Sequence, residues 1–206
     1  MEPSPLIRPR RKRLPLSLLC WLLWAMAQPA GADDSAGAPS SYLAVYAGRL
    51  SADPLFETLT LRADLDSDFP LRGLAVGHTL ARYTRQRSLA IELQYAQHTG
   101  VQDYDEYVVV AIYRWAGFAW DDSLRTTFAV GEGLSYITED SQLEALRHTE
   151  TARFLNYLLF EMTLAPPTVR DWRFLVRVHH RSGVYGLFSG VHGASNAIVM
   201  GLRHDF

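Results

Sequence analysis

The sequence predicts an all-β protein, an eight-stranded antiparallel β-barrel of the outer-membrane type. Three observations favour this fold: an export signal at the amino end, apolar runs that reach ten or eleven residues, and alternation of apolar and polar side chains along those runs. After residue 41 no window keeps a 3.6-residue apolar period, so helices contribute little to the prediction.

The amino end has the pattern of a cleavable signal peptide covering residues 1–32. Basic residues between Arg8 and Arg13 precede an apolar run from Leu14 to Ala27. That run is shorter than the roughly 20 apolar residues of a membrane-spanning helix. Small residues permit cleavage after Ala27 or after Ala32, and the pattern leaves both sites open.

The remaining chain divides into a short leader and one domain. Residues 33–41 are small, polar and proline-containing, which predicts a flexible leader, and the barrel is expected over residues 42–206. The only cysteine, Cys20, and the only lysine, Lys12, lie in the signal, so the exported domain has no disulfide. Nothing in its composition forms the basic face that nucleic-acid binding requires.

Nine segments rich in β-branched and aromatic residues follow one another, with turn-like breaks between them. They are Tyr42 to Arg49, Glu57 to Ala63, Gly73 to Tyr83, Leu89 to His98, Tyr107 to Phe118, Thr126 to Ile137, Phe154 to Leu164, Trp172 to Ser182 and Asn196 to Phe206.

The length and number of these segments indicate a membrane barrel. Soluble strands usually have five or six residues, whereas a tilted strand needs about 9 to 11 residues to cross a bilayer. Bacterial single-chain barrels have an even number of strands, with eight as the smallest common size. Glu57 to Ala63 is the segment we discount, because it is short and acidic turns flank it.

Side-chain alternation agrees with a wall that has one apolar face. In the last segment Ile198, Met200 and Leu202 share one face, and the chain ends on Phe206, as outer-membrane barrels commonly do. Aromatic residues near the expected strand ends predict an interfacial belt, with ordinary core packing as the alternative. These residues are Tyr42, Tyr83, Tyr95, Tyr104, Tyr113, Trp115, Trp120 and Trp172.

The expected lumen carries paired charges and no recognisable cofactor or metal motif. We expect these charged side chains to form a hydrogen-bonded plug inside the barrel. They are Glu92, Glu132, Glu161, Arg114, Arg177 and Arg203. His179 and His180 are not expected to share a metal ion, because neighbouring residues on a strand point to opposite faces.

The segment from Trp172 to Ser182 contains the candidate chemistry. Arg177, His179 and Arg181 share the face expected to look into the lumen, so His180 and Ser182 are expected to face lipid. Residues two apart on a strand lie about 6.5 to 7 Å apart at Cα, which allows an imidazole and a hydroxyl to meet.

This end of the chain, HHRSGVYGLFSGVHGASNAIVMGLRHDF, resembles the lipid A 3-O-deacylase (PagL-type) family. The resemblance implies an esterase in the outer membrane that hydrolyses an ester-linked acyl chain of lipopolysaccharide without a cofactor. The family's outward His-x-Ser corresponds to His180 and Ser182. Its glutamate on the last strand corresponds to Asn196, which completes the candidate catalytic set.

Two positions depart from the family pattern. Asn196 supplies a side-chain carbonyl to orient the histidine but no negative charge. Gly183 stands where the family often has asparagine after the serine, so an oxyanion donor is expected from the backbone. A non-enzymatic outer-membrane barrel, acting as a scaffold or surface contact protein, is the main alternative function, and a soluble exported lipid-binding barrel is the third.

Overall fold

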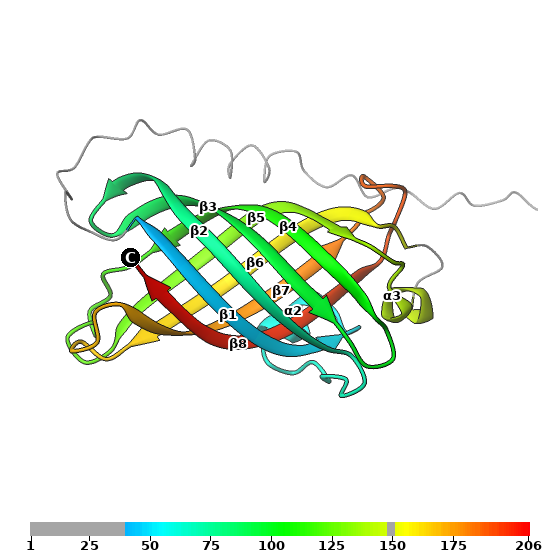
Figure 1. The fold of residues 1–206 in the computed structure, drawn as a ribbon, viewed down its shortest axis with the longest axis horizontal. Coiled ribbons are helices and arrows are strands. Elements are labelled where there is room, and N and C mark those ends of the chain that lie inside the picture. Colours follow the sequence, from blue (N-terminus) through cyan, green and yellow to red (C-terminus); the bar gives the residue numbers. More distant parts are fainter. Residues whose placement is uncertain (1–39, 148–150) are drawn as a thin grey trace, which may run out of the picture. The chain divides into compact units, whose positions relative to one another are not determined.

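The computed structural model describes residues 40–147 and 151–206, which form a closed antiparallel barrel of eight strands (Figure 1). Each strand pairs with its neighbour along the chain, and β1 closes the barrel on β8. The strands are β1 (Ser41–Ser51), β2 (Pro70–Thr84), β3 (Arg87–His98), β4 (Tyr104–Trp115), β5 (Arg125–Ile137), β6 (Phe154–Ala165), β7 (Trp172–Ser182) and β8 (Ala194–Asp205). The predicted fold class is confirmed.

The discounted segment, Glu57 to Ala63, is not a strand. Part of it belongs to a short helix, α2 (Leu55–Leu59), within the connection between β1 and β2. Within the described ranges no helix is long and apolar enough to cross a membrane. The expected signal peptide, and the expected leader up to residue 39, lie outside the described residues.

The fourth strand was expected three residues too late, as Tyr107 to Phe118 instead of β4 at Tyr104–Trp115. Its end is set by a turn in which Gly117 has a φ of +81°. The carboxylate of Asp121 accepts hydrogen bonds from the backbone N–H groups of Gly117 and Phe118, at 3.1 Å each. These two N–H groups therefore do not take part in strand pairing.

The two ends of the barrel have connections of different length. The end where β1 begins and β8 finishes, here called the terminal end, has the connections 85–86, 116–124 and 166–171. The opposite end, here called the loop end, has the connections 52–69, 99–103, 138–153 and 183–193, and α3 (Gln142–Arg147) lies there (Figure 1). Outer-membrane barrels show this asymmetry, with short periplasmic turns and longer outer loops.

The outer wall is apolar between aromatic residues at both ends. Trp115, Trp120 and Trp172 are exposed towards the terminal end, as an interfacial belt requires. Two of the expected belt residues were wrongly placed, because Tyr42 and Tyr104 are buried inside the barrel. The hydroxyl of Tyr42 donates to Glu92 at 2.7 Å, so this tyrosine belongs to the lumen.

A network of buried ions fills the middle of the lumen. Glu161 lies 2.8 Å from Arg114, 2.5 Å from Arg177 and 3.7 Å from Arg203. Arg177 also contacts Glu92 at 2.9 Å, and both of these side chains are fully buried. Buried charges persist when each has opposite charges and hydrogen bonds around it. These five residues therefore form the plug that the sequence predicts.

Glu132 is the member of the expected plug that the structure contradicts. The inward positions of β5 carry small side chains, including Gly131, Gly133 and Ser135, whereas Phe128 and Glu132 point outward and are exposed. The register of β5 therefore places this carboxylate on the outer wall.

At the loop end a second polar cluster closes the lumen. Arg181 contacts Glu144 of α3 at 2.6 Å, and the Ser195 hydroxyl donates to the same carboxylate at 2.8 Å. Deeper in the barrel, His179 lies 3.0 Å from Glu106. From the plug to the loop end, the interior is therefore occupied by side chains that contact one another.

Replacing Glu161 with alanine tests the plug. The change leaves three arginines without their shared carboxylate, so we expect a loss of about 3–5 kcal/mol in the free energy of unfolding. Urea titration of the barrel in lipid vesicles measures this loss. The matched control is Glu139→Ala, because the exposed Glu139–Arg153 pair should leave the unfolding midpoint unchanged. Equal stability of both variants would contradict the plug.

Candidate active site

The site lies on the outer wall at the loop end, where β7 and β8 pair. His180 on β7 is directly opposite Asn196 on β8, and the His180 Nδ1 atom lies 2.6 Å from Asn196 Oδ1. His179 points the other way, into the lumen, where it contacts Glu106. The structure therefore brings two of the three expected site residues into direct contact.

The hydrogen bonds of Asn196 determine which imidazole nitrogen carries the proton. The Asn196 Nδ2 group donates to the backbone carbonyl of Asp53 at 2.7 Å, so the amide oxygen is the atom that faces His180. An amide oxygen only accepts, and His180 must therefore donate from Nδ1. In the neutral ring this leaves Nε2 as an acceptor, which is the form that a general base requires.

Ser182 follows His180 on the same face of β7. The two residues lie two positions apart, so their side chains leave the strand on the same side. Among the described residues, no hydrogen bond joins the Ser182 hydroxyl to the imidazole or to any other group. Catalytic hydrogen bonds are often long before substrate binds and shorten in the complex.

Gly183 has no room for the side chain that the family often carries after the serine. A Cβ atom built at Gly183 would lie 2.0 Å from the backbone oxygen of Val191 and 2.6 Å from its carbonyl carbon. Because both contacts are with backbone, a side chain at 183 would force the loop to move. A side-chain oxyanion donor is therefore sterically excluded at this position.

A side-chain amide is present on the other neighbour of β7. Asn156 of β6 is directly opposite Ser182. Its Nδ2 group donates to the carboxylate of Glu132 on β5 and to the backbone oxygen of Gly133, the latter at 3.3 Å. Sequence reasoning missed this pair: Asn156 breaks the apolar outward face of its segment, and Glu132 was assigned to the lumen. Alternation counted from Phe128 would have placed Glu132 correctly.

Five polar side chains therefore form one row across four strands of an otherwise apolar wall. In order around the barrel they are Glu132, Asn156, Ser182, His180 and Asn196. Polar groups on a wall of this type are costly unless they are paired or used. Among the described residues, no group of three or more His, Cys, Asp or Glu side chains is arranged to hold a metal ion.

The connection 52–69 covers part of this row and is here called the cover segment. Its helix α2 packs against β7 and β8 (Figure 1). His180 and Ser182 are each only 9% exposed and Asn196 only 2%, whereas Met200, farther along the same face of β8, is 54% exposed. The expected lipid-facing position therefore needs correction, because these side chains point outward but are buried. On this side the cover segment contacts β7 and β8 through α2, and it contacts Asn196 through the Asp53 carbonyl.

The loop 183–193 follows Ser182 directly and has an unusual backbone. Val184 and Tyr185 both have left-handed conformations, with φ of 48° and 55°. Such conformations cost on the order of 1–3 kcal/mol in residues with a side chain, and they gather at functional sites. Among the described residues, neither N–H group donates to a backbone carbonyl. The side chains of Tyr185 and Leu187 are each 75% exposed.

Comparisons with known proteins find similarity in structure only. No protein-family model and no curated protein sequence matches the chain. The crystal structure of the outer membrane enzyme PagL aligns with a TM-score of 0.57 and 10% sequence identity, covering 81% of this chain and 100% of PagL. Neisserial surface protein A (NspA) aligns with a TM-score of 0.51 and 12% identity, covering 82% of this chain and 99% of NspA. The chain therefore has the fold of the eight-stranded outer-membrane β-barrels.

Proposed function

We propose that this protein is a lipid A 3-O-deacylase-like esterase that hydrolyses an ester-linked acyl chain of lipopolysaccharide in the outer leaflet of the outer membrane. The observation that supports this most strongly is the His180–Asn196 hydrogen bond, which leaves Nε2 of His180 as an acceptor on the same face of β7 as Ser182. The substrate is the only partner the reaction needs besides water.

An outward site suits a substrate that is itself part of the membrane. With the loop end towards the cell exterior, the row from Glu132 to Asn196 lies at the level of the outer leaflet. The ester and acyl chains of a lipid then reach the wall from the bilayer, once the cover segment leaves a path to Ser182. The plug around Glu161 blocks the alternative route through the lumen.

Each residue of the site has a defined step in this reaction. His180 Nε2 removes the hydroxyl proton of Ser182 while the serine oxygen attacks the ester carbonyl. The tetrahedral intermediate collapses, the ester bond breaks, and the imidazolium returns the proton to the departing sugar oxygen. Water, activated by His180 in the same way, then releases the fatty acid from Ser182. Asn196 holds the ring through both halves.

The oxyanion requires donors near Ser182, and the row supplies a side-chain donor. The Nδ2 group of Asn156, across the strand pair from Ser182, has two hydrogens. Glu132 accepts one, and the other donates to the Gly133 carbonyl at 3.3 Å, a contact that it must leave to reach the oxyanion. The N–H groups of Val184 and Tyr185 are further donors close to Ser182 in sequence. Together they take the place of the asparagine that Gly183 excludes.

Two likenesses support the proposal. The carboxyl-terminal segment resembles the lipid A 3-O-deacylase family in its His-x-Ser spacing, and PagL, whose fold this chain shares, is described as an outer membrane enzyme. Asn196 in place of the family glutamate lowers the expected activity, since the amide adds no charge to stabilise imidazolium.

A non-enzymatic barrel is the second candidate function. The cover segment favours it, because Ser182, His180 and Asn196 are buried and Asn196 donates to the Asp53 carbonyl of that segment, as in a purely structural contact. For the esterase, the same segment must move aside or leave a path for the ester. Experiments on Ser182 separate the two functions.

Mass spectrometry of lipid A from cells with and without the protein tests the proposal. Expression should remove one ester-linked acyl chain, and Ser182→Ala or His180→Ala should abolish this change while the barrel still folds. His179→Ala is the matched control: it weakens a luminal contact with Glu106, so it should lower stability but retain activity. Unaltered lipid A in every case would favour the non-enzymatic barrel.

Replacing Asn156 with leucine tests the proposed oxyanion donor. Leucine suits an outward position and keeps the barrel folded, but it removes the amide hydrogens. We expect kcat for ester hydrolysis to fall by about 10²–10³-fold with little change in KM, because the contact forms only in the transition state. An unchanged kcat would show that the backbone donors suffice.

A further inference from the structure

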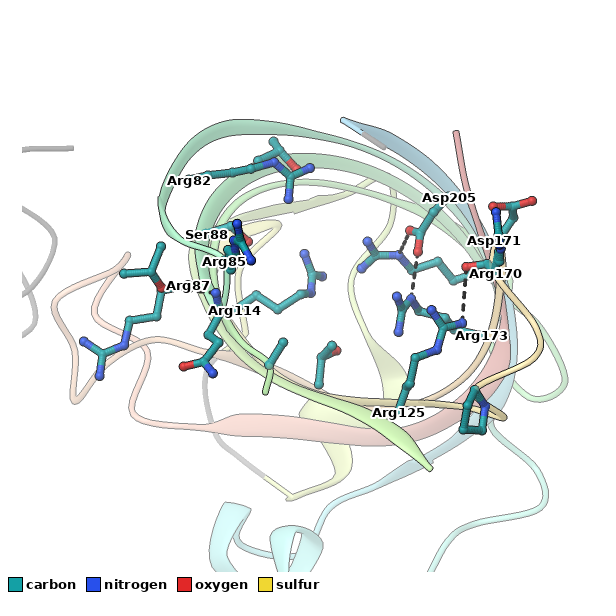
Figure 2. Close-up of a pocket in the computed structure, with 17 residues that line it drawn as sticks. Arg82, Arg85, Arg87, Ser88, Arg114, Arg125, Arg170, Asp171, Arg173 and Asp205 are labelled. Atoms are coloured by element: carbon teal, nitrogen blue, oxygen red, sulfur yellow. Dashed lines mark hydrogen bonds and ion pairs between the residues drawn. The ribbon is translucent and has the colours of Figure 1, made fainter. Parts of the chain in front are cut away.

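A cavity of about 600 Å³ opens at the terminal end of the barrel, at the opposite end from Ser182 (Figure 2). Small-molecule sites usually have volumes of about 300–1,000 Å³. Among the described residues, its lining contains eight arginines but only two acidic residues, Asp171 and Asp205. The cavity therefore has the size of a ligand site and a strong excess of positive charge.

One of the two acidic residues of the lining, Asp205, is already engaged. Asp205 accepts from Arg173 at 2.7 Å and from Arg203 at 2.6 Å. Arg125 makes one contact, at 3.4 Å, with the backbone oxygen of Arg170, and its buried Nε has no partner among the described residues. Neither Arg125 nor Arg170 forms an ion pair with any of the described residues. Among the described residues, Arg125 and Arg170 thus lack a counter-charge.

A β-bulge directs one of the arginines into the cavity. The pairing of β2 with β3 shifts register between Thr79 and Ala81, so Leu80 is an extra residue in β2. After the shift Arg82 pairs with Ser88, and both line the cavity. If Leu80 were instead a regular strand residue, strict alternation from the inward Thr79 would place Arg82 on the outer wall. Bulges with this effect occur at barrel rims and beside binding sites.

The cavity ends blindly within the barrel. Arg114 and Arg203 lie at its inner limit, where Arg114 contacts Glu161 of the plug at 2.8 Å. The guanidinium carbon of Arg203 lies 3.6 Å from the centroid of the Tyr42 ring. Figure 2 shows Arg114, Arg125, Arg173 and Asp205 reaching into the ring of strands. A molecule entering from the terminal end can bind here, but the plug prevents its passage.

We propose that this cavity binds a soluble multivalent oxyanion whose charges are phosphate or carboxylate groups. Guanidinium groups present paired donors that match both groups, and these charge-assisted hydrogen bonds are among the strongest in proteins. A concave site lined by one sign of charge also concentrates counter-ions. This site is independent of the proposed esterase, because the plug separates it from the outward row.

Calorimetric titration of the full-length mature barrel in detergent tests this site, with tripolyphosphate and citrate as probes at roughly 0.15 M ionic strength. We expect saturable binding with one molecule per barrel. The double variant Arg82→Gln/Arg125→Gln should weaken it by about tenfold or more, since two charge-assisted donors to the anion are lost. Preference for tripolyphosphate would assign phosphate, and preference for citrate would assign carboxylate.

The matched control is Arg72→Gln on the same strand. Arg72 is exposed, lies towards the loop end and donates to Gln97 at 2.6 Å, so its loss should leave the affinity unchanged. Heat-modifiable migration of each variant verifies that the barrel is closed. Absence of saturable binding for both probes, or equal affinity in the double variant and the parent, would overturn the proposal.

Discussion

The ion network centred on Glu161 is the interaction on which the rest of the structure depends. It lets a narrow barrel bury three arginines, and it divides the lumen into separate regions at the loop end and the terminal end. The ions of the plug pair with one another inside the barrel, so they do not explain why polar side chains stand on the outer wall. The row containing Ser182 therefore requires another role.

Asparagine at position 196 has a physical reason in this fold. Its carbonyl oxygen accepts from His180 while its amide nitrogen donates to the backbone of Asp53, which ties the cover segment to the wall. A glutamate would orient and stabilise the histidine more strongly, but a carboxylate has no hydrogen to donate to Asp53. The residue that departs from the family pattern thus links the site to its cover, and the close approach of Val191 similarly accounts for Gly183.

The fold was predictable because strand length, strand number and alternation all follow from crossing a bilayer as a closed sheet. Alternation also separates His179 from His180, which the structure places on opposite faces. Contacts set by loops were not predictable: the burial of His180 and Ser182 depends on how the cover segment folds back. Glu132 was misplaced because it was assigned, with the other charged residues of the strands, to a plug of paired charges in the lumen, although the small inward residues of β5 indicate an outward position. The bulge at Leu80 was also not predictable, because the order of apolar and polar residues along this strand does not reveal an extra residue.

Covalent labelling of the folded barrel with a lipid-like fluorophosphonate tests the central claim most directly, since an activated serine displaces fluoride and keeps the phosphonate. Peptide mass spectrometry should find one adduct, on Ser182. Its rate of formation should fall by about 10²-fold or more in His180→Ala, because the serine then lacks its general base. An unlabelled Ser182 in the folded protein, or equal labelling without the imidazole, would contradict an outward catalytic site.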